Sequence, residues 1–212
     1  MVNIIDKYSK DLKSSRQVIF ANLPSEFGRF QIYSFPSQEH VEPNLVLLSE
    51  SFDPNSIQAP YIRIHSECMT GDVFGSLRCD CRFQLISSLE MIDNHGGLLI
   101  YLRQEGRGIG INEKIKAYKL QEQGQDSVEA NLSLGHQADL RSYGEAIEIL
   151  KYFEVSKLNL ISNNPQKFKS IQDAGIQILE HIHIEKPLDE YNSDYLHTKK
   201  FKMGHYLKNV GK

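Results

Sequence analysis

The chain has 212 residues, of which 40% are hydrophobic and 24% charged, and its formal net charge is −3. These values are typical of a globular protein; they exclude a wholly disordered chain and give no overall charge signature of nucleic-acid binding. No run approaches the ~20 apolar residues of a membrane span, and the first residues lack the apolar stretch of a signal peptide. We therefore expect a cytoplasmic protein that binds neither nucleic acid nor membranes.

Residues 1–21 are polar with weak periodicity and are predicted to form a peripheral arm. After them, apolar runs predict strands, helical spacings predict helices, and Gly or Pro marks their ends. The predicted strands are 29–35, 44–49, 61–66, 98–102, 158–161 and 176–184, and the predicted helices are 82–94, 111–123, 142–153 and 165–175. Strands and helices alternate after residue 60, which predicts an α/β fold, with α+β as the alternative, in which helices pack on a mixed β-sheet.

The predicted strand 61–66 has two unlike faces. Ile62 and Ile64 point to one side of the sheet, and Arg63 and His65 point to the other, because side chains alternate along a strand. The strand therefore predicts a core face and a cationic, titratable surface.

The C-terminal end of the chain is basic. Between residue 197 and residue 212 there are lysines and no acidic residue: Lys199, Lys200, Lys202, Lys208 and Lys212. A solvated terminal helix with a basic tail at 208–212 is the simplest interpretation. The alternative is a positive rim that attracts a polyanionic small molecule.

All three cysteines of the chain, Cys68, Cys79 and Cys81, lie within one short segment. Their odd number and the expected compartment argue against a disulfide framework. In an extended segment Cys79 and Cys81 share a face and can reach one ion, and Cys68 can supply a third ligand across a turn. Three ligands leave one tetrahedral position for water, which is typical of catalytic zinc. The alternatives are three reduced thiols without metal, or a closed site with His65 as fourth ligand.

Three thiolates weaken zinc as a Lewis acid, so cations are expected beside it, and Arg63, Arg78 and Arg82 are close in sequence. The segment 103–110 combines glycines with two arginines between a predicted strand and a predicted helix. Backbone N–H groups at a helix start suit an anionic group, so this segment is a candidate phosphate-binding loop. Its spacing is neither that of a P-loop nor that of a dinucleotide fingerprint, and an ordinary Gly-rich turn is the alternative.

Three further candidates have a simple structural interpretation as well. Asp139 and Arg141 form either a functional pair or an exposed ion pair. Gln84 is either a ligand-binding amide or a surface residue of its helix. Tyr118 is either a site residue or part of the core, because it shares a helical stripe with Ile111 and Ile115.

Taken together, these segments resemble GTP cyclohydrolase II. The likeness covers residues 22–207, the predicted catalytic domain, and rests on RIHSECMTGDVFGSLRCDCRFQL (63–85), YLRQEGRGIGINEKIKAYKL (101–120), SVEANLSLGHQADLR (127–141), ISNNPQK (161–167) and HTKKFKMGHYL (197–207). The cysteine segment joined to the RQEGR segment is specific to that family. The resemblance implies a single GTP cyclohydrolase II-like domain, too short to include the dihydroxybutanone phosphate synthase half of fused relatives.

The resemblance also implies a reaction, the first step of riboflavin biosynthesis. GTP loses pyrophosphate, water opens the imidazole ring, and C8 leaves as formate, giving 2,5-diamino-6-(5-phosphoribosylamino)pyrimidin-4(3H)-one. The implied cofactors are one zinc ion per chain and magnesium with the triphosphate, and the family is typically homodimeric.

The family's functional positions map onto this sequence. Cys68, Cys79 and Cys81 fall on the zinc ligands, and the GTP-contacting positions are Arg63, Ile64, His65, Ser66, Glu67, Gln84, Glu105, Gly106, Arg107, Ser127, Ser162 and Lys167. Asp139 and Arg141 fall on the general base and the nucleophile toward the α-phosphorus, and Tyr118 on a tyrosine that assists hydrolysis. Because a guanidinium has a pKa above ~12, a purely electrostatic role for Arg141 is the alternative unless Asp139 takes its proton.

Three positions depart from the family pattern. Arg82 stands where glycine is common, and Ser127 and Ser162 stand where threonine is common, although serine keeps the hydroxyl group. Two other functions compete with this prediction. One is that of a related enzyme that keeps C8 as a formyl group, against which Tyr118 argues. The other is that of a non-catalytic zinc module that binds a nucleotide or nucleic acid.

Overall fold

The computed structural model describes residues 18–211. Its strands are β1 (Ile19–Ser25), β2 (Gly28–Phe35), β3 (Asn44–Ser49), β4 (Tyr61–Ser66), β5 (Gly97–Leu102), β6 (Lys157–Ile161) and β7 (Gln177–Ile182). Its helices are α2 (Met69–Asp72), α3 (Cys81–His95), α4 (Gly110–Gln121), α5 (Ser127–Ser133), α6 (Gly144–Tyr152), α7 (Pro165–Asp173) and α8 (Ser193–Phe201), with a 3-10 helix, η1 (Glu105–Gly108), before α4.

The strands form one mixed sheet in the order β1-β2-β3-β5-β4-β6-β7. The pairs from β1 to β5 are antiparallel, and the pairs that join β5, β4, β6 and β7 are parallel. The predicted α/β fold with helices on a mixed sheet is therefore confirmed.

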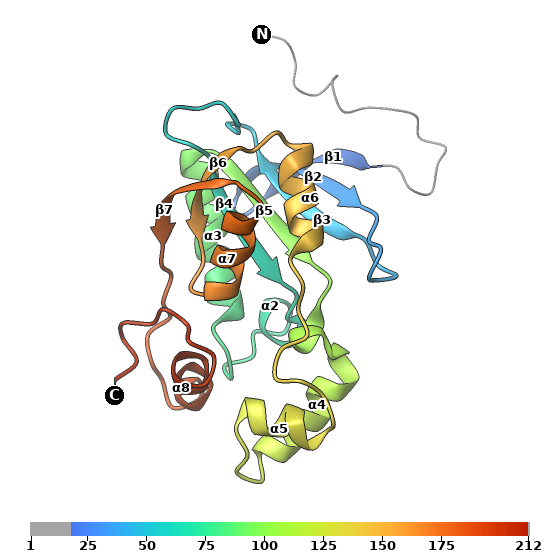
Figure 1. The fold of residues 1–212 in the computed structure, drawn as a ribbon, viewed down its shortest axis with the longest axis vertical. Coiled ribbons are helices and arrows are strands. Elements are labelled where there is room, and N and C mark those ends of the chain that lie inside the picture. The colour runs from blue at the N-terminus through green and yellow to red at the C-terminus, as the bar shows by residue number, and fades with distance from the viewer. Residues whose placement is uncertain (1–17, 212) are drawn as a thin grey trace.

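Helices cover both faces of the sheet (Figure 1), with α3 on one side and α6 and α7 on the other. The larger core cluster joins β2, β3, β4 and β5 to α6 and α7, and a smaller cluster packs Leu89 and Ile92 of α3 against Leu99 of β5. Ile62 and Ile64 are fully buried in the larger cluster, as predicted for one face of β4.

The opposite face of β4 is not a surface, which corrects one prediction. Arg63 and His65 are only 5% and 2% exposed. Arg63 Nη2 donates to Gln84 Oε1 on α3 at 2.6 Å, so α3 covers this polar face with a polar partner. A buried charge is tolerated only with such partners.

The predicted arm was drawn too long. Its residues 19–21 belong to β1, in which Ile19 pairs with Ser34 and Phe20 stacks on Tyr33 with ring centroids 4.9 Å apart. Residues 1–17 of the predicted arm lie outside the described residues.

All the predicted strands and helices are present, whereas β1, α2 and α5 were not predicted. The single turn of α2 is too short for a periodic signal. A signal for α5 does exist: Asp126 caps its first turn and Glu129 bonds back to the Asp126 backbone, which is the capping-box pattern.

The parallel strands β4 and β5 end at the same edge of the sheet, where α2 and η1 follow them. The α4–α5 pair and α8 gather at this same end of the molecule (Figure 1). The carboxyl edge of parallel strands is the usual location of ligand sites in such folds. Within residues 18–211, no helix is long and apolar enough to cross a membrane.

Candidate active site

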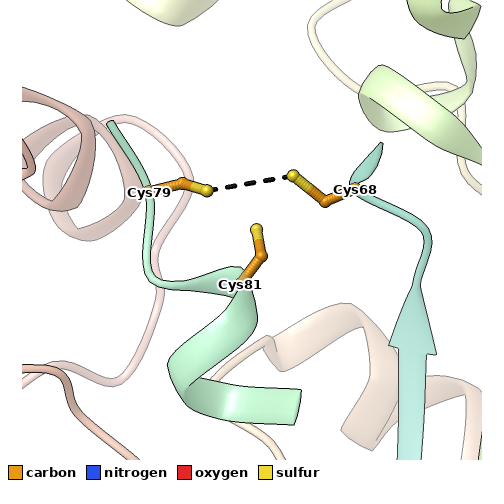
Figure 2. Close-up of side chains that lie close together, drawn as sticks. All are labelled: Cys68, Cys79 and Cys81. Atoms are coloured by element: carbon orange, nitrogen blue, oxygen red, sulfur yellow. Dashed lines mark hydrogen bonds between the residues drawn. The ribbon is translucent and has the colours of Figure 1, made fainter. Parts of the chain in front are cut away.

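The three cysteine thiols converge at this edge (Figure 2), each from a different local structure. Cys68 follows β4, Cys79 lies in the loop before α3, and Cys81 is the first residue of α3. Their sulfur atoms all lie within 4.8 Å of one another, and the Cys68 and Cys79 sulfurs are 3.8 Å apart. The predicted three-thiol cluster therefore exists as a geometric unit.

The segment that carries Cys79 and Cys81 is not the extended one that the sequence predicted. Asp80, between the two cysteines, has φ −100° and ψ 8°, so the segment is not extended. The chain turns into α3 at this point, and this turn brings Cys79 and Cys81 to the same side.

The thiols lie close enough to shift one another's pKa values in opposite directions. Hydrogen bonds from Cys79 and Cys81 lower the pKa of Cys68, whereas the hydrogen bond to Cys68 raises the pKa of Cys79 to about 12. All three cysteines are free, and sulfur ligands suit zinc. The residues present therefore fit such an ion.

Gly71 of α2 provides the space for this arrangement. A Cβ at this position would lie 2.8 Å from the Cys79 sulfur and 3.1 Å from the Cys68 sulfur. Real Cβ atoms essentially never approach sulfur or other heavy atoms to 2.8 Å. The backbone at Gly71 therefore packs directly against the thiols.

A cation in direct contact with a sulfur is Lys114 of α4, which the sequence pattern did not indicate. Its Nζ donates to Cys68 Sγ at 3.1 Å and to Glu105 Oε1 at 2.7 Å. Burial alone would lower the pKa of Lys114, but the charges of Cys68 and Glu105 raise it, so the amine stays charged. A cation does lie beside the thiols as expected, but it is Lys114 and not one of the three arginines named from the sequence.

The arginines expected there have other partners. Arg78 lies over the Tyr118 ring at 4.9 Å and pairs with Glu122 at 3.0 Å. Arg82 Nη1 donates to the Asp72 carbonyl oxygen at 2.7 Å, so it binds the backbone at the end of α2. The unusual residue Arg82 is thereby accommodated without entering the thiol cluster.

His65 does not act as a fourth ligand in this arrangement. Its Nε2 lies 3.1 Å from Asp72 Oδ2, which also accepts hydrogen bonds from the Cys68 N–H at 3.0 Å and the Tyr101 hydroxyl at 2.8 Å. His65 therefore supports the cluster through Asp72, which holds the backbone of one cysteine.

The Gly-rich segment adopts a strained turn. Gly106 and Arg107 both have φ of 62°, in the left-handed region that a non-glycine residue rarely adopts. Arg107 Nη2 donates to Ser127 Oγ at 2.8 Å, whereas its buried Nη1 has no hydrogen-bond partner among the described residues. Strain and an unpaired donor together are typical of a ligand-binding turn.

Two adjacent cavities meet at this edge. The first is lined by all three cysteines, Glu67, Lys114 and Tyr118, and the second by Arg63, Gln84, Ser162 and Lys167. Both are lined by Ser66, Cys81, Arg107, Arg141 and Tyr195. The cavities therefore adjoin, and around them the structure gathers the three predicted thiols and most of the predicted nucleotide-contacting residues, with Arg141 and Tyr118.

The second cavity, which we call the cation cavity, concentrates buried positive charge. Lys167 is 4% exposed, and its Nζ donates to the Ile64 carbonyl oxygen at 2.8 Å. Burial, followed by the charges of Arg63, Arg141 and Lys199, lowers the pKa of Lys167 well below its usual value. Such a cluster is costly without counter-charge, so it favours a polyanionic ligand.

Asp139 and Arg141 form a paired unit rather than an exposed ion pair. Arg141 donates from Nε and Nη2 to the two carboxylate oxygens of Asp139, at 2.8 and 2.6 Å. The two side chains are only 12% and 10% exposed. Burial opposes ionisation of both, but their mutual hydrogen bonds lower the pKa of Asp139 and raise that of Arg141.

The simple interpretations of Gln84 and Tyr118 are wrong. Gln84 is 8% exposed, and its amide nitrogen donates to Asp80 Oδ2 at 2.6 Å, so it is not a surface residue. The Tyr118 hydroxyl lies 3.0 Å from Thr70 Oγ1, while Ile111 and Ile115 on its stripe are exposed. Tyr118 thus lines the first cavity instead of the core.

Three other predicted residues lie beside the cavities or support their walls. The Ile64 side chain is in the core, so it meets the cation cavity only through its carbonyl oxygen. Glu105 Oε2 accepts the Met69 N–H at 2.6 Å and Oε1 accepts the Gly106 N–H at 2.6 Å, so its carboxylate joins α2 to η1. Glu67 pairs with Arg103 at 3.0 Å at the rim of the first cavity.

The fold and this site define an α/β protein with a candidate metal-dependent active site for an anionic substrate. A family model described as GTP cyclohydrolase II matches residues 15–183. The chain belongs to the GTP cyclohydrolase II family.

Several curated staphylococcal proteins named riboflavin biosynthesis protein RibBA are similar to this chain. That of Staphylococcus epidermidis is 48% identical over 185 residues, which cover 87% of this chain and 46% of the relative. That of Staphylococcus saprophyticus is 46% identical over 204 residues (96% and 51%), and that of Staphylococcus aureus is 45% identical over 210 residues (98% and 52%). The chain thus spans about half the length of these relatives.

Among solved structures, RibBX of A. baumannii, a two-domain 3,4-dihydroxy-2-butanone 4-phosphate synthase, aligns with 82% of this chain and 42% of its own. The TM-score is 0.46 and the identity 16%, a likeness too distant to bear on function.

Proposed function

We propose that this chain hydrolyses GTP to 2,5-diamino-6-(5-phosphoribosylamino)pyrimidin-4(3H)-one, formate and pyrophosphate, the first step of riboflavin biosynthesis. The observation that carries the proposal is that the thiol cluster lies beside the cation cavity, since five residues line both cavities. GTP fits both parts of the site: its polyphosphate suits the cation cavity, and its imidazole ring, which needs an activated water for opening, suits the thiol cluster. Family membership supports the same reaction.

Cys68, Cys79 and Cys81 would hold one zinc ion per chain. Zinc held there supplies an activated water for hydrolysis at C8 of the purine. Lys114 offsets part of the thiolate charge, and the Tyr118 hydroxyl faces the same cavity, where it can move a proton during ring opening. Magnesium would accompany the triphosphate.

We assign the triphosphate to the cation cavity. Arg63 and Arg107 supply positive charge there, Lys167 would gain its proton when phosphate offsets the neighbouring cations, and the free Nη1 of Arg107 supplies an unused donor. Ser127 holds the Arg107 guanidinium through its hydroxyl oxygen, and the Ser162 hydroxyl oxygen accepts the Asn164 N–H at 3.0 Å beside Lys167. Serine is sufficient for both hydrogen bonds, so the departures from threonine do not oppose binding.

Asp139 and Arg141 would act at the α-phosphorus. The ion pair keeps Arg141 protonated, which suits neutralisation of a phosphate. Attack by Arg141 requires transfer of a proton to Asp139, whose two oxygens already accept hydrogen bonds from Nε and Nη2. Both roles are compatible with this geometry, and a substitution described in the Discussion separates them.

Gln84 is proposed to bind the guanine edge, although both ends of its amide are engaged by Arg63 and Asp80. Guanine recognition would therefore exchange one of these hydrogen bonds for one with the base.

We also propose a homodimer in the cytoplasm. Val73, Phe74 and Leu77 are exposed in the loop between α2 and α3, an apolar surface that a second subunit would cover. Free thiols suit a reducing compartment. Sedimentation equilibrium should give twice the mass of one chain.

One assay tests the reaction. The purified protein, incubated with GTP, Mg²⁺ and Zn²⁺, should release formate and pyrophosphate with the diaminopyrimidine as product. Protein purified without added metal should contain about one zinc per chain, and Cys79→Ser should release no formate. A product that retains C8 as a formyl group would replace the proposal with the ring-opening rival. Binding of GTP without any product would favour the non-catalytic module.

A further inference from the structure

The end of α8 and the segment after it form a wall of the cation cavity, although they lie beyond the residues that the family model matches. Lys199, Met203 and His205 line this cavity together with Arg63 and Lys167. The basic end of the chain is therefore not simply a solvated tail, and part of it faces the proposed substrate.

His205 has an unused polar atom in this wall. The residue is 9% exposed, and its buried Nε2 has no hydrogen-bond partner among the described residues. A buried polar atom without a partner costs free energy, so an imidazole nitrogen in this state is explained when a ligand supplies the partner.

The charges around His205 indicate what kind of ligand that is. Burial, and then the positive charges of Lys199, Arg141, Lys167 and Arg107, keep the imidazole neutral, with its pKa lowered to about 2. A neutral imidazole can donate one N–H, and anionic oxygen is the acceptor that these surrounding cations attract.

The segment is held in place by contacts on three sides. Lys199 Nζ donates to Asp80 Oδ1 at 2.6 Å, and the His205 N–H donates to the Lys199 carbonyl oxygen at 3.0 Å. The Tyr206 N–H donates to the Asn163 carbonyl oxygen at 2.9 Å, and Lys202 pairs with Glu129 of α5 at 2.9 Å. The segment that carries the imidazole is thus anchored to the cysteine loop, to the residues after β6 and to α5.

We propose that His205 is a further substrate-binding residue, which donates a hydrogen bond from Nε2 to a phosphate oxygen of the bound nucleotide. The inference rests on the proposed function for the identity of the nucleotide. Binding of a polyphosphate by this imidazole in the cation cavity can be tested separately from the hydrolysis of GTP.

The experiment measures binding to the zinc-loaded protein by titration calorimetry. The probes are inorganic tripolyphosphate, guanosine, and a GTP analogue with a methylene group between the α- and β-phosphorus, which cannot release pyrophosphate. His205→Ala should weaken tripolyphosphate and the analogue by about tenfold or more, because a hydrogen bond to a charged group is lost. Its affinity for guanosine should stay that of the wild type.

Two variants serve as controls. His205→Gln, whose amide can donate in place of Nε2, should retain most of the affinity and shows that the site folds with an altered side chain. His197→Ala changes the same residue type on α8, where His197 bonds the Ser193 carbonyl oxygen and lines neither cavity, and should bind all probes normally.

A folded His205→Ala protein with wild-type affinity for both phosphate probes overturns the inference. If the wild type binds tripolyphosphate in a His205-dependent manner but yields no formate from GTP, the proposed function fails and the inference stands. If the wild type yields formate while His205→Ala binds normally, only the inference fails.

Discussion

Lys114 Nζ lies 3.1 Å from the sulfur of Cys68, so a charged amine of α4 faces the thiol cluster directly. Zinc with three thiolates carries one net negative charge, which this amine offsets. The contact joins residues 46 positions apart and makes α4 part of the proposed metal centre.

Lys114→Met should therefore weaken zinc binding. Loss of the cation raises the pKa of Cys68, so protons compete more strongly with the metal. We expect zinc affinity at pH 7 to fall by about tenfold, with a smaller loss at pH 9. Competition with a chromogenic chelator measures this, and Lys116→Met is the matched control, because Lys116 is 62% exposed and pairs with Glu113 at 2.6 Å. Equal affinities for wild type and Lys114→Met at both pH values would contradict the role.

Arg141→Lys separates the two roles of Arg141. If the residue only neutralises phosphate, lysine should keep substantial pyrophosphate release, because a point charge can still do so. If it is the nucleophile, lysine should fail, and Cys79→Ser mixed with GTP should accumulate a guanylyl adduct on Arg141. Intact-mass spectrometry over time detects the adduct. GMP without any adduct, together with an active Arg141→Lys, would leave Asp139 as base for direct attack by water.

Gln84→Ala should reduce both stability and base selectivity. The substitution leaves Arg63 and Asp80 without their shared amide, and such loss in a buried site costs about 1–3 kcal/mol of unfolding free energy. The preference for GTP over ITP or ATP, measured as the ratio of kcat/KM values, should narrow. A destabilised variant with an unchanged ratio would restrict Gln84 to the structural role.

The N-terminal boundary can be tested by two deletions. Removal of residues 1–17 should leave formate release largely intact, because the paired strand begins at Ile19. Removal of residues 1–25 deletes β1 and exposes Tyr33 and the edge of β2, and should lower the Tm. Near-total loss of activity in a folded 1–17 deletion would show that those residues help to build the site.

His205 should make stability pH-dependent. Burial lowers its pKa in the folded protein to about 2, against 6.5 as the ordinary value, so between these values only the unfolded chain binds the proton. Stability from this group is present above pH 6.5 and is lost as pH falls, with a limiting slope of roughly 1.4 kcal/mol per pH unit. Urea unfolding from pH 7.5 to 5.5 should show His205→Gln gaining stability relative to wild type as pH decreases. A constant difference would mean that folding does not shift the pKa of His205.

Strands and helices were predictable where apolar spacing is regular. The predicted helix 142–153 corresponds to α6, whose residues Ala146, Ile149 and Leu150 are buried at helical spacing. The edge strand β1 lacks that signal because most of its side chains are exposed.

Long-range contacts explain what sequence patterns missed at the site. Arg63 looks like a surface residue until α3 covers it, and Lys114 looks like one of many helix lysines until α4 packs beside Cys68. The three-cysteine spacing was informative because its members are close in sequence, whereas His205 and Arg63 meet only in the folded cavity.

The direct packing of Gly71 against two sulfurs has a consequence for how this protein tolerates variation. A saturation scan of the segment 68–81 would score position 71 as intolerant as the cysteines themselves, although glycine contributes no ligand atom. Even alanine, the smallest replacement, would have to displace sulfur. Intolerance at this position would therefore reflect the lack of space beside the sulfurs and not a role of residue 71 as a ligand.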